Sequence, residues 1–240
     1  MSKILVIDDE KTTLNMFRLF LTAYGHTVFL AEDGETGLET FLNEKPSIVF
    51  TDIKMPGIDG FEVLRRIKEM DPATEVIVVT GHGDMDLAVQ ALNLNATDFI
   101  NKPIQRTALD SALGRAQQRL QWSQPQINRI GSSQVEGVMV LRVEGDITSL
   151  SEQTLTDAYE QATGEGVRKI LMHFDRNSSI NGAGIAILIQ LLSKSKKRGQ
   201  LVAITGVPEN FKKIFDLVGI TRFAEVFDHA EEAVTALSRC

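Results

Sequence analysis

The stretch Ile48-Val-Phe-Thr-Asp-Ile-Lys-Met-Pro-Gly57 decides the fold of this chain. Its apolar run, residues 48–50, predicts a buried strand. One carboxylate, Asp52, follows the run, and the turn signal Pro56-Gly57 comes shortly after it. In an open parallel sheet, functional side chains collect where the strands end. A single acid there is more often a helix cap than a nucleophile, so its meaning depends on what other strands bring to the same edge.

Strand and helix signals alternate five times on either side of this stretch. Helical spacing of apolar residues separates short apolar runs at residues 3–7, 26–31, 48–50, 75–80 and 97–101. This alternation predicts a parallel sheet with helices on both faces. Right-handed crossovers would then place the carboxyl ends of all the strands on one edge.

That edge is expected to hold the side chains of Asp8, Asp9, Asp52, Thr80 and Lys102. Three neighbouring carboxylates raise one another's pKa unless a cation is present, and an oxygen-rich site of this kind suits Mg²⁺. Lys102 adds a positive charge that could pair with a carboxylate or a phosphoryl oxygen, and Thr80 adds a hydroxyl donor. Together they predict a phosphoryl-transfer site with a carboxylate nucleophile.

With these residues the first half of the chain resembles a response-regulator receiver domain. The resemblance rests on Asp8-Asp9, Asp52 within Asp-Ile-Lys-Met-Pro-Gly-Ile-Asp-Gly, Thr80-Gly81, and Phe99 followed by Lys102-Pro103. It implies a flavodoxin-like (βα)5 domain with a five-stranded parallel sheet over residues 1–120.

The resemblance also implies a role for each polar residue of the site. Asp52 would accept a phosphoryl group from a phosphohistidine on a sensor histidine kinase, and Lys102 would contact that group. Mg²⁺ would be held by Asp9, Asp52 and the backbone carbonyl of Lys54, with Asp8 acting mostly through water. Such a domain catalyses only its own phosphorylation and dephosphorylation, so we expect no other enzymatic activity.

Two further pairs of residues follow from the same resemblance. Thr80 would move towards the acyl phosphate, and the switch residue Phe99 would turn inward with it. Lys54 and His82 occupy positions that tune the lifetime of the phosphate. Taken alone, His82 is better explained as a solvated loop histidine.

Composition limits the other classes of function. The chain has 240 residues, enough for two domains, and a net charge of −7 that does not favour nucleic-acid binding. No apolar run approaches the roughly 20 residues that span a bilayer, and the first residues do not form a signal peptide. The single cysteine, Cys240, allows no intrachain disulfide. We therefore expect a cytoplasmic protein without a membrane span.

The second half begins after a polar, glutamine-rich segment, residues 121–134, which predicts a linker. A β-branched run at residues 138–143 starts a second α/β domain, residues 135–240, for which we expect a mixed sheet with helices on one side. The glycine-containing loop at residues 177–184 matches neither a P-loop nor a dinucleotide fingerprint. No nucleophile–base pair accompanies it, so no enzyme is predicted here.

This half resembles a STAS domain, the fold of anti-sigma-factor antagonists. The resemblance rests on Ile170-Leu-Met-His-Phe-Asp175 and Ile180-Asn-Gly-Ala-Gly-Ile-Ala-Ile-Leu188. It implies binding to an anti-sigma factor or a serine-kinase-like regulator. Antagonists that a kinase switches off carry a serine after the Asp or Asn of this loop, whereas here Gly182 follows Asn181. Asp52 is then the favoured phosphorylation site of the chain.

Together the two resemblances predict a response regulator with a STAS output. Phosphorylation of Asp52 would change docking between the domains, or formation of a homodimer, and so gate binding to the partner. A scaffold or adaptor in a larger sensory complex is the alternative that the sequence leaves open. A DNA-binding regulator would need a helix-turn-helix and a basic face, and a signalling enzyme would need a nucleophile or metal site in the second half.

Overall fold

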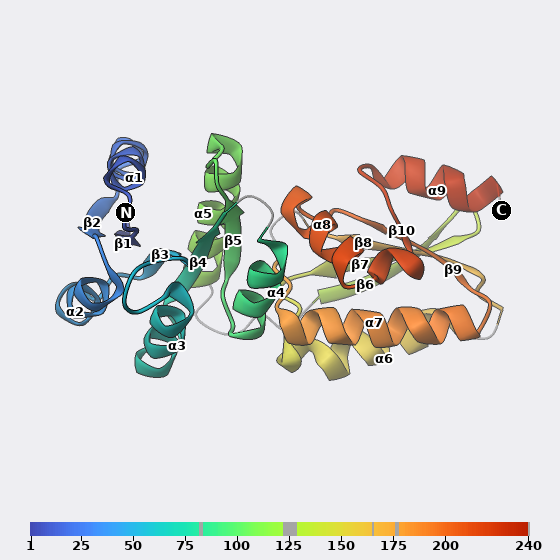
Figure 1. The fold of residues 1–240 in the computed structure, drawn as a ribbon. Helices are drawn as coiled ribbons and strands as arrows, with labels where there is room; N and C mark the ends of the chain where they lie inside the picture. Colours follow the sequence, from blue (N-terminus) through green and yellow to red (C-terminus); the bar gives the residue numbers. More distant parts are fainter. Residues whose placement is uncertain (82–83, 122–128, 165, 176–177, 240) are drawn as a thin grey trace. The chain divides into compact units, whose positions relative to one another are not determined.

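The computed structural model describes residues 1–81, 84–121, 129–164, 166–175 and 178–239. The chain divides into two compact units, Met1–Ser123 and Gln124–Cys240, and each contains a five-stranded sheet (Figure 1). Among the described residues, no helix combines the length and the apolar character needed to cross a membrane.

The first unit is built on the parallel sheet that the sequence predicts. The strand order is β2-β1-β3-β4-β5, and every pairing is parallel. The strands are β1 (Lys3–Ile7), β2 (Thr27–Ala31), β3 (Ile48–Asp52), β4 (Glu75–Thr80) and β5 (Asp98–Asn101). β3, from the opening stretch, is buried along its whole length, because helices cover both of its faces.

The described residues of this unit form five helices, which divide between the two faces of the sheet (Figure 1). Apolar residues of α1 and α5 join the core on one face, while α2, α3 and α4 lie on the other. The helices are α1 (Lys11–Ala23), α2 (Gly34–Glu44), α3 (Gly60–Met70), α4 (Met85–Asn93) and α5 (Arg106–Gln121).

The start of α3 fixes the end of β3. Asp59 caps α3, because its side chain accepts a hydrogen bond from the backbone N–H of Glu62. Gly60 then lies against the backbone, where an added Cβ would be 2.1 Å from the carbonyl oxygen of Asp52. Only glycine allows this approach, so the sequence Asp59-Gly60 holds Asp52 at the edge of the sheet.

Two ion pairs attach the C-terminal half of α5 to the amino ends of β4 and β5, at the edge of the sheet opposite to Asp52. Arg115 and Asp98 are both buried and form an ion pair, in which Arg115 Nε lies 2.7 Å from Asp98 Oδ2. Arg119 Nε lies 2.9 Å from Glu75 Oε2, at the start of β4. Buried charges are stable only when paired, so these contacts fix the position of α5 along the sheet.

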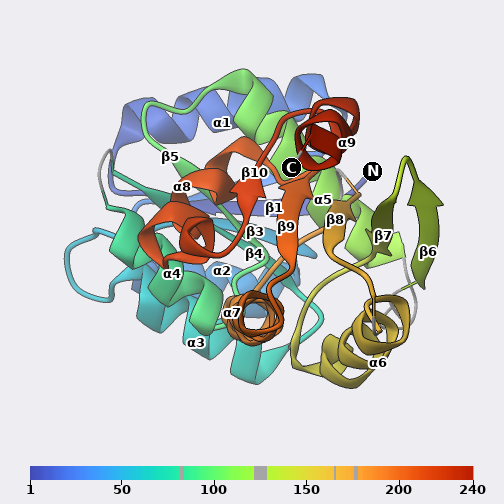
Figure 2. The same cartoon turned by 90° about the vertical axis from the view of Figure 1, so that its right-hand side faces the viewer.

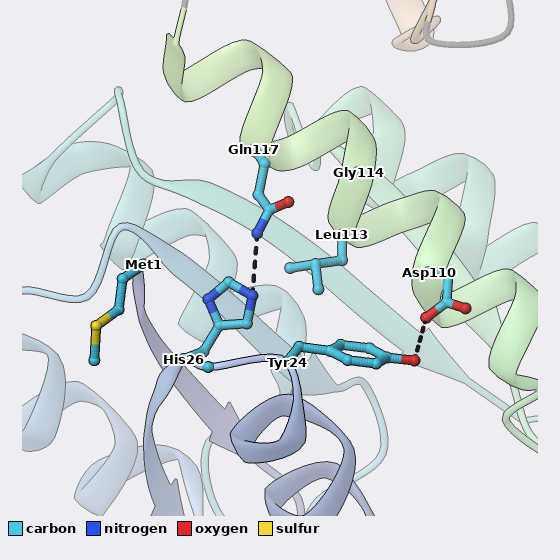
Figure 3. Close-up of a pocket in the computed structure, with 8 residues that line it drawn as sticks. Met1, Tyr24, His26, Asp110, Leu113, Gly114 and Gln117 are labelled. Atoms are coloured by element: carbon cyan, nitrogen blue, oxygen red, sulfur yellow. Dashed lines mark hydrogen bonds between the residues drawn. The ribbon is translucent and has the colours of Figure 1, made fainter.

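A depression of about 470 Å³ lies between the α1–β2 turn and α5 (Figure 3). The hydroxyl of Tyr24 donates to Asp110 Oδ1 at 2.6 Å, and the amide of Gln117 lies 3.1 Å from His26 Nε2. Gly114, between these two contacts on α5, has no side chain to fill the space.

The buried His26 gives the first unit a pH-dependent stability. Burial lowers the pKa of His26, so the folded state favours the neutral ring. The unfolded chain binds the proton at its ordinary pKa of about 6.5, so the contribution of this ring to stability is present above that pH and is lost as the pH falls. We expect a His26→Gln variant to lose less stability than the parent between pH 7.5 and 5.5, measured by urea unfolding.

The exposed His229, in the other unit, provides the control for this prediction. His229→Gln should leave the pH dependence of the first unit unchanged. Equal losses of stability in the parent and in His26→Gln would contradict the assignment of this effect to His26.

The second unit contains the mixed sheet that the sequence predicts, in the order β10-β9-β8-β7-β6. The pairing of β6 with β7 is antiparallel, and the remaining pairings are parallel. The strands are β6 (Arg129–Val135), β7 (Val138–Glu144), β8 (Lys169–Phe174), β9 (Leu201–Thr205) and β10 (Glu225–Val226).

Residues 129–134, which the sequence analysis assigns to the linker, belong to β6 instead. Val135 pairs with Val138 across a two-residue turn, Glu136-Gly137, in which both residues have positive φ. Such turns match the twist of an antiparallel hairpin. β6 is an exposed edge strand that needs no apolar face, so its composition gave no strand signal. The rest of the predicted linker, residues 122–128, lies outside the described residues.

Helices cover both faces of this sheet, whereas we expected them on one side (Figure 2). α9 packs on Val140, Leu171 and Ala203, while α6 and α7 lie on the other face. The neighbouring strand residues, which point to that other face, are apolar and buried as well, so both faces require a cover. The helical elements are η1 (Ser149–Ser151), α6 (Glu152–Ala162), α7 (Gly182–Lys197), α8 (Glu209–Leu217), η2 (Ile220–Arg222) and α9 (Ala230–Arg239).

Candidate functional site

Three carboxylates meet at the carboxyl edge of the first sheet. Asp52 is the last residue of β3 and is 5% exposed, and Asp8 follows β1 and is 1% exposed. Asp9, the next residue, is exposed. Oxygen atoms of the three side chains lie within 4.8 Å of one another. The predicted convergence of these acids is thus present in the structure.

The ammonium of Lys102 lies among these acids. Its Nζ is 2.9 Å from Asp52 Oδ2, 3.0 Å from Asp8 Oδ2 and 3.4 Å from Glu10 Oε2. Burial opposes the charge on Lys102, but the neighbouring carboxylates of Asp52 and Asp8 outweigh it and raise the pKa of the amine. Lys102 is therefore fully charged at neutral pH. The part of Glu10 in this site is not evident from the sequence, because an exposed carboxylate gives no signal of its own.

The acidic residues fit a divalent cation. Asp8 Oδ1 accepts a hydrogen bond from the backbone N–H of Glu10 at 2.9 Å, whereas the buried Asp8 Oδ2 has the ion pair with Lys102 but no well-formed hydrogen bond. Burial raises the pKa of Asp8 by more than the backbone N–H of Glu10 and the ammonium of Lys102 lower it. Oxygen ligands with surplus negative charge are those that Mg²⁺ prefers. The ligand role of the Lys54 carbonyl stays a prediction.

Thr80 and Phe99, the predicted switch residues, are both buried. The hydroxyl of Thr80 donates to Asn101 Oδ1 at 2.8 Å, and the Thr80 carbonyl accepts from the backbone N–H of Lys102 at 2.7 Å. Phe99 is 1% exposed, so its ring already lies inside. The inward turn of Phe99 on phosphorylation stays a prediction.

Lys54 contacts a residue that the sequence analysis did not consider. Its Nζ lies 2.8 Å from Asp84 Oδ2, which joins the segment after β3 to the segment after β4. Asp84 precedes α4 but makes no capping hydrogen bond, and its Oδ2 would lie 2.7 Å from a Cβ added to Gly81. Gly81 thus leaves room for the Asp84 carboxylate. His82, the other predicted lifetime residue, lies outside the described residues.

In the second unit, Asn181 and Gly182 lie at the start of α7. Asn181 caps the helix by accepting a hydrogen bond from the backbone N–H of Gly184 at 3.0 Å, and Gly182 is the first helical residue. A Cβ on Gly184 would be 2.2 Å from the carbonyl oxygen of Ile147, so this helix start packs against the segment after β7.

The serines before Asn181 are enclosed. Ser178 and Ser179 are 2% and 3% exposed. The backbone N–H and the hydroxyl of Ser179 both donate to Asp146 Oδ1, at 3.1 and 2.8 Å. Next to them, Ile180 forms a parallel bridge with Ile147. These two hydroxyls are therefore enclosed in the structure and do not face solvent.

Comparison with protein families assigns both halves of the chain. A model of the response regulator receiver domain matches residues 4–114, and a model of the STAS domain matches residues 130–233. The chain joins a receiver domain to a STAS domain. Both resemblances noted from the sequence are thereby confirmed.

Curated relatives match in the receiver domain. The C4-dicarboxylate transport transcriptional regulatory protein DctD of Pseudomonas aeruginosa is 39% identical over 115 residues, which cover 48% of this chain and 25% of DctD. The transcriptional regulatory protein FixJ of Bradyrhizobium diazoefficiens is 34% identical over 113 residues, covering 47% of this chain and 55% of FixJ. The chain thus spans between a quarter and about half of the length of these relatives.

Solved receiver structures are similar over the same half. A response regulator receiver domain protein of Clostridium thermocellum is 37% identical, with a TM-score of 0.49, and the match covers 50% of this chain and 98% of that one. The receiver domain of NtrX from Brucella abortus is 34% identical, with a TM-score of 0.46, covering 50% and 99%.

Proposed function

We propose that this protein is the response regulator of a phosphorelay, with Asp52 as the acceptor of a phosphoryl group from a sensor histidine kinase. The observation that carries the proposal is the Lys102 ammonium, 2.9 Å from Asp52 and 3.0 Å from Asp8. A buried carboxylate beside a fixed cation has the arrangement that phosphoryl transfer requires, because the negative charge of the transferred group needs compensation.

The chemistry at Asp52 is a pair of displacements at phosphorus. A carboxylate oxygen of Asp52 attacks the phosphorus of the phosphohistidine, and the P–N bond breaks with its electron pair leaving on the imidazole. The signal ends by hydrolysis, in which water attacks the acyl phosphate, the bond between phosphorus and Asp52 breaks, and inorganic phosphate is released. The chain needs no enzymatic activity beyond these two reactions on itself.

Residues around Asp52 position and neutralise the phosphoryl group. Mg²⁺, when held by Asp8, Asp9 and Asp52, supplies positive charge to the oxygens of the transferred group. Lys102 adds a second positive charge from a fixed position, and the hydroxyl of Thr80 is the neutral donor at the end of the neighbouring strand.

The STAS domain is proposed as an output that binds a protein partner, either an anti-sigma factor or a serine-kinase-like regulator. Gly182 has no hydroxyl, and Ser178 and Ser179 are buried, which supports control through Asp52 instead of through this loop. Phosphorylation would change domain docking or homodimer formation in a cytoplasmic protein. In the alternative function, as a scaffold, the STAS domain would bind its partner regardless of phosphorylation.

Labelling tests the phosphorylation part of the proposal. The full chain is incubated with Mg²⁺ and radiolabelled acetyl phosphate. We expect label that hydroxylamine removes, as it does from an acyl phosphate, and that maps to the peptide containing Asp52. Label on serine, stable to hydroxylamine, would refute the proposal, as would an absence of label with both acetyl phosphate and a phosphorylated kinase.

A binding measurement tests the output. Purified anti-sigma factors and serine-kinase-like regulators are titrated with the chain in the presence and absence of beryllofluoride, which mimics the acyl phosphate. A different affinity in the two states supports gating. Equal affinity would favour the scaffold.

A further inference from the structure

Asn101 contacts the hydroxyl that phosphorylation is expected to use. Thr80 and Asn101 are the last residues of β4 and β5, and they are direct partners in the parallel register of these strands. Their side chains therefore leave the sheet on the same side, and the Thr80 hydroxyl donates to Asn101 Oδ1 at 2.8 Å.

We propose that Asn101 is a positioning residue that holds the Thr80 hydroxyl in the resting state and thereby weakens binding of the phosphoryl group. The inference rests on the proposed phosphorylation of Asp52. A hydroxyl carries one proton and can donate it to one strong acceptor at a time. While Asn101 accepts this proton, a phosphoryl oxygen cannot, so the site becomes competent only when the bond to Asn101 opens.

The contacts around Thr80 concentrate the change in its side chain. The backbone is tied by the bond between the Thr80 carbonyl and the N–H of Lys102, at 2.7 Å. The ring of Phe99 is already buried, so no aromatic side chain has to enter the core first. Rotation of the Thr80 hydroxyl away from Asn101 is then the smallest movement that frees the donor.

The size of the expected change in affinity follows from the difference in burial between Thr80 and Asn101. Thr80 is fully buried, whereas Asn101 is half-buried and can accept a hydrogen bond from water once Thr80 has turned away. Opening the contact therefore leaves no buried acceptor without a partner. A single neutral hydrogen bond corresponds to a factor of about 2–10 in an equilibrium constant, and the affinity for a phosphoryl mimic should be reduced by that factor.

The test is the affinity of the full chain for beryllofluoride in saturating Mg²⁺, measured by isothermal titration calorimetry. Asn101→Ala should bind about 2- to 10-fold more tightly than the parent, the value of one hydrogen bond. In a Thr80→Val background, which lacks the hydroxyl, Asn101→Ala should change nothing. In a Thr80→Ser background, which restores it, the gain should reappear.

Thr97→Val is the matched control, because the Thr97 hydroxyl, just before the start of β5, donates to the carboxylate of Glu75, the first residue of β4, at the opposite edge. It should lower thermal stability without changing the affinity for beryllofluoride. Unchanged affinity in Asn101→Ala, or an equal gain in the Thr80→Val background, would overturn the inference.

The parent protein separates failure of this inference from failure of the proposed function. If the parent and Asn101→Ala bind beryllofluoride with the same affinity, only the role proposed for Asn101 is refuted. If the parent binds no beryllofluoride, the phosphorylation of Asp52 is itself refuted, and the inference is refuted with it.

Discussion

An Asp52→Asn variant will take up no hydroxylamine-sensitive label from acetyl phosphate. The amide has no oxygen able to form an acyl phosphate, and Asp8, the other buried carboxylate beside Lys102, is assigned to the cation instead. The fold should persist, because asparagine has nearly the same shape and Lys102 keeps its ion pairs with Asp8 and Glu10. Labelling of the full chain and its thermal unfolding are measured on the same samples.

Asp33→Asn is the control that removes one acidic charge without touching the site. Asp33 caps α2 by accepting from the backbone N–H of Thr36, and asparagine is an equally good cap. This variant should label like the parent. Label retained on Asp52→Asn at the parental level would mean that another residue is the acceptor.

The sequence predicted the first unit well because its signals are local. Most strands are apolar runs of the right length, and the acids and the lysine lie at strand ends or directly after them. Once the chain alternates between strand and helix, the handedness of the crossovers brings these ends together without any knowledge of side-chain contacts. That is why Asp8, Asp9, Asp52 and Lys102 could be placed on one edge beforehand.

Contacts between side chains of different strands could not be predicted in the same way. The bond between Thr80 and Asn101 depends on the exact register of β4 and β5, and the ion pair of Lys54 with Asp84 depends on the path of two loops. A shift of one residue would point Asn101 to the other face. The local sequence around Asn101 contains nothing that sets this register.

The second unit shows where local composition misleads. β6 is polar, so it was assigned to the linker, and only the hairpin turn at Glu136-Gly137 reveals it. The helices on both faces of the sheet were missed because an apolar run is ambiguous. Neighbouring residues of β7 are apolar, which fits a strand buried on both faces, but it fits any other short buried segment equally well.

A Lys102→Met variant will separate metal binding from phosphoryl transfer. Methionine keeps most of the length of the side chain but removes the charge that compensates Asp8 and Asp52. Removal of one preorganised donor from a transition state typically lowers the rate by roughly 10²–10³-fold, and we expect a loss of that size in labelling by acetyl phosphate. Mg²⁺ should still bind, and at least as tightly as in the parent.

The reason for the retained Mg²⁺ affinity is electrostatic. In the parent, the ammonium of Lys102 and a metal ion compete for the same carboxylate oxygens, and without the ammonium the acids repel one another more strongly. A divalent cation relieves that repulsion. The affinity for Mg²⁺, measured by calorimetric titration, should therefore be kept or increased in the variant whose rate of labelling falls.

Lys3→Met is the matched control, because Lys3 is exposed and pairs with Glu44 near the amino end of β1, away from the acids. It should change neither measurement. A Lys102→Met protein that labels at the parental rate would show that the fixed ammonium has no part in the transfer. Loss of both labelling and Mg²⁺ binding would show instead that Lys102 holds the acidic residues in place, because charge compensation alone predicts that the metal site survives.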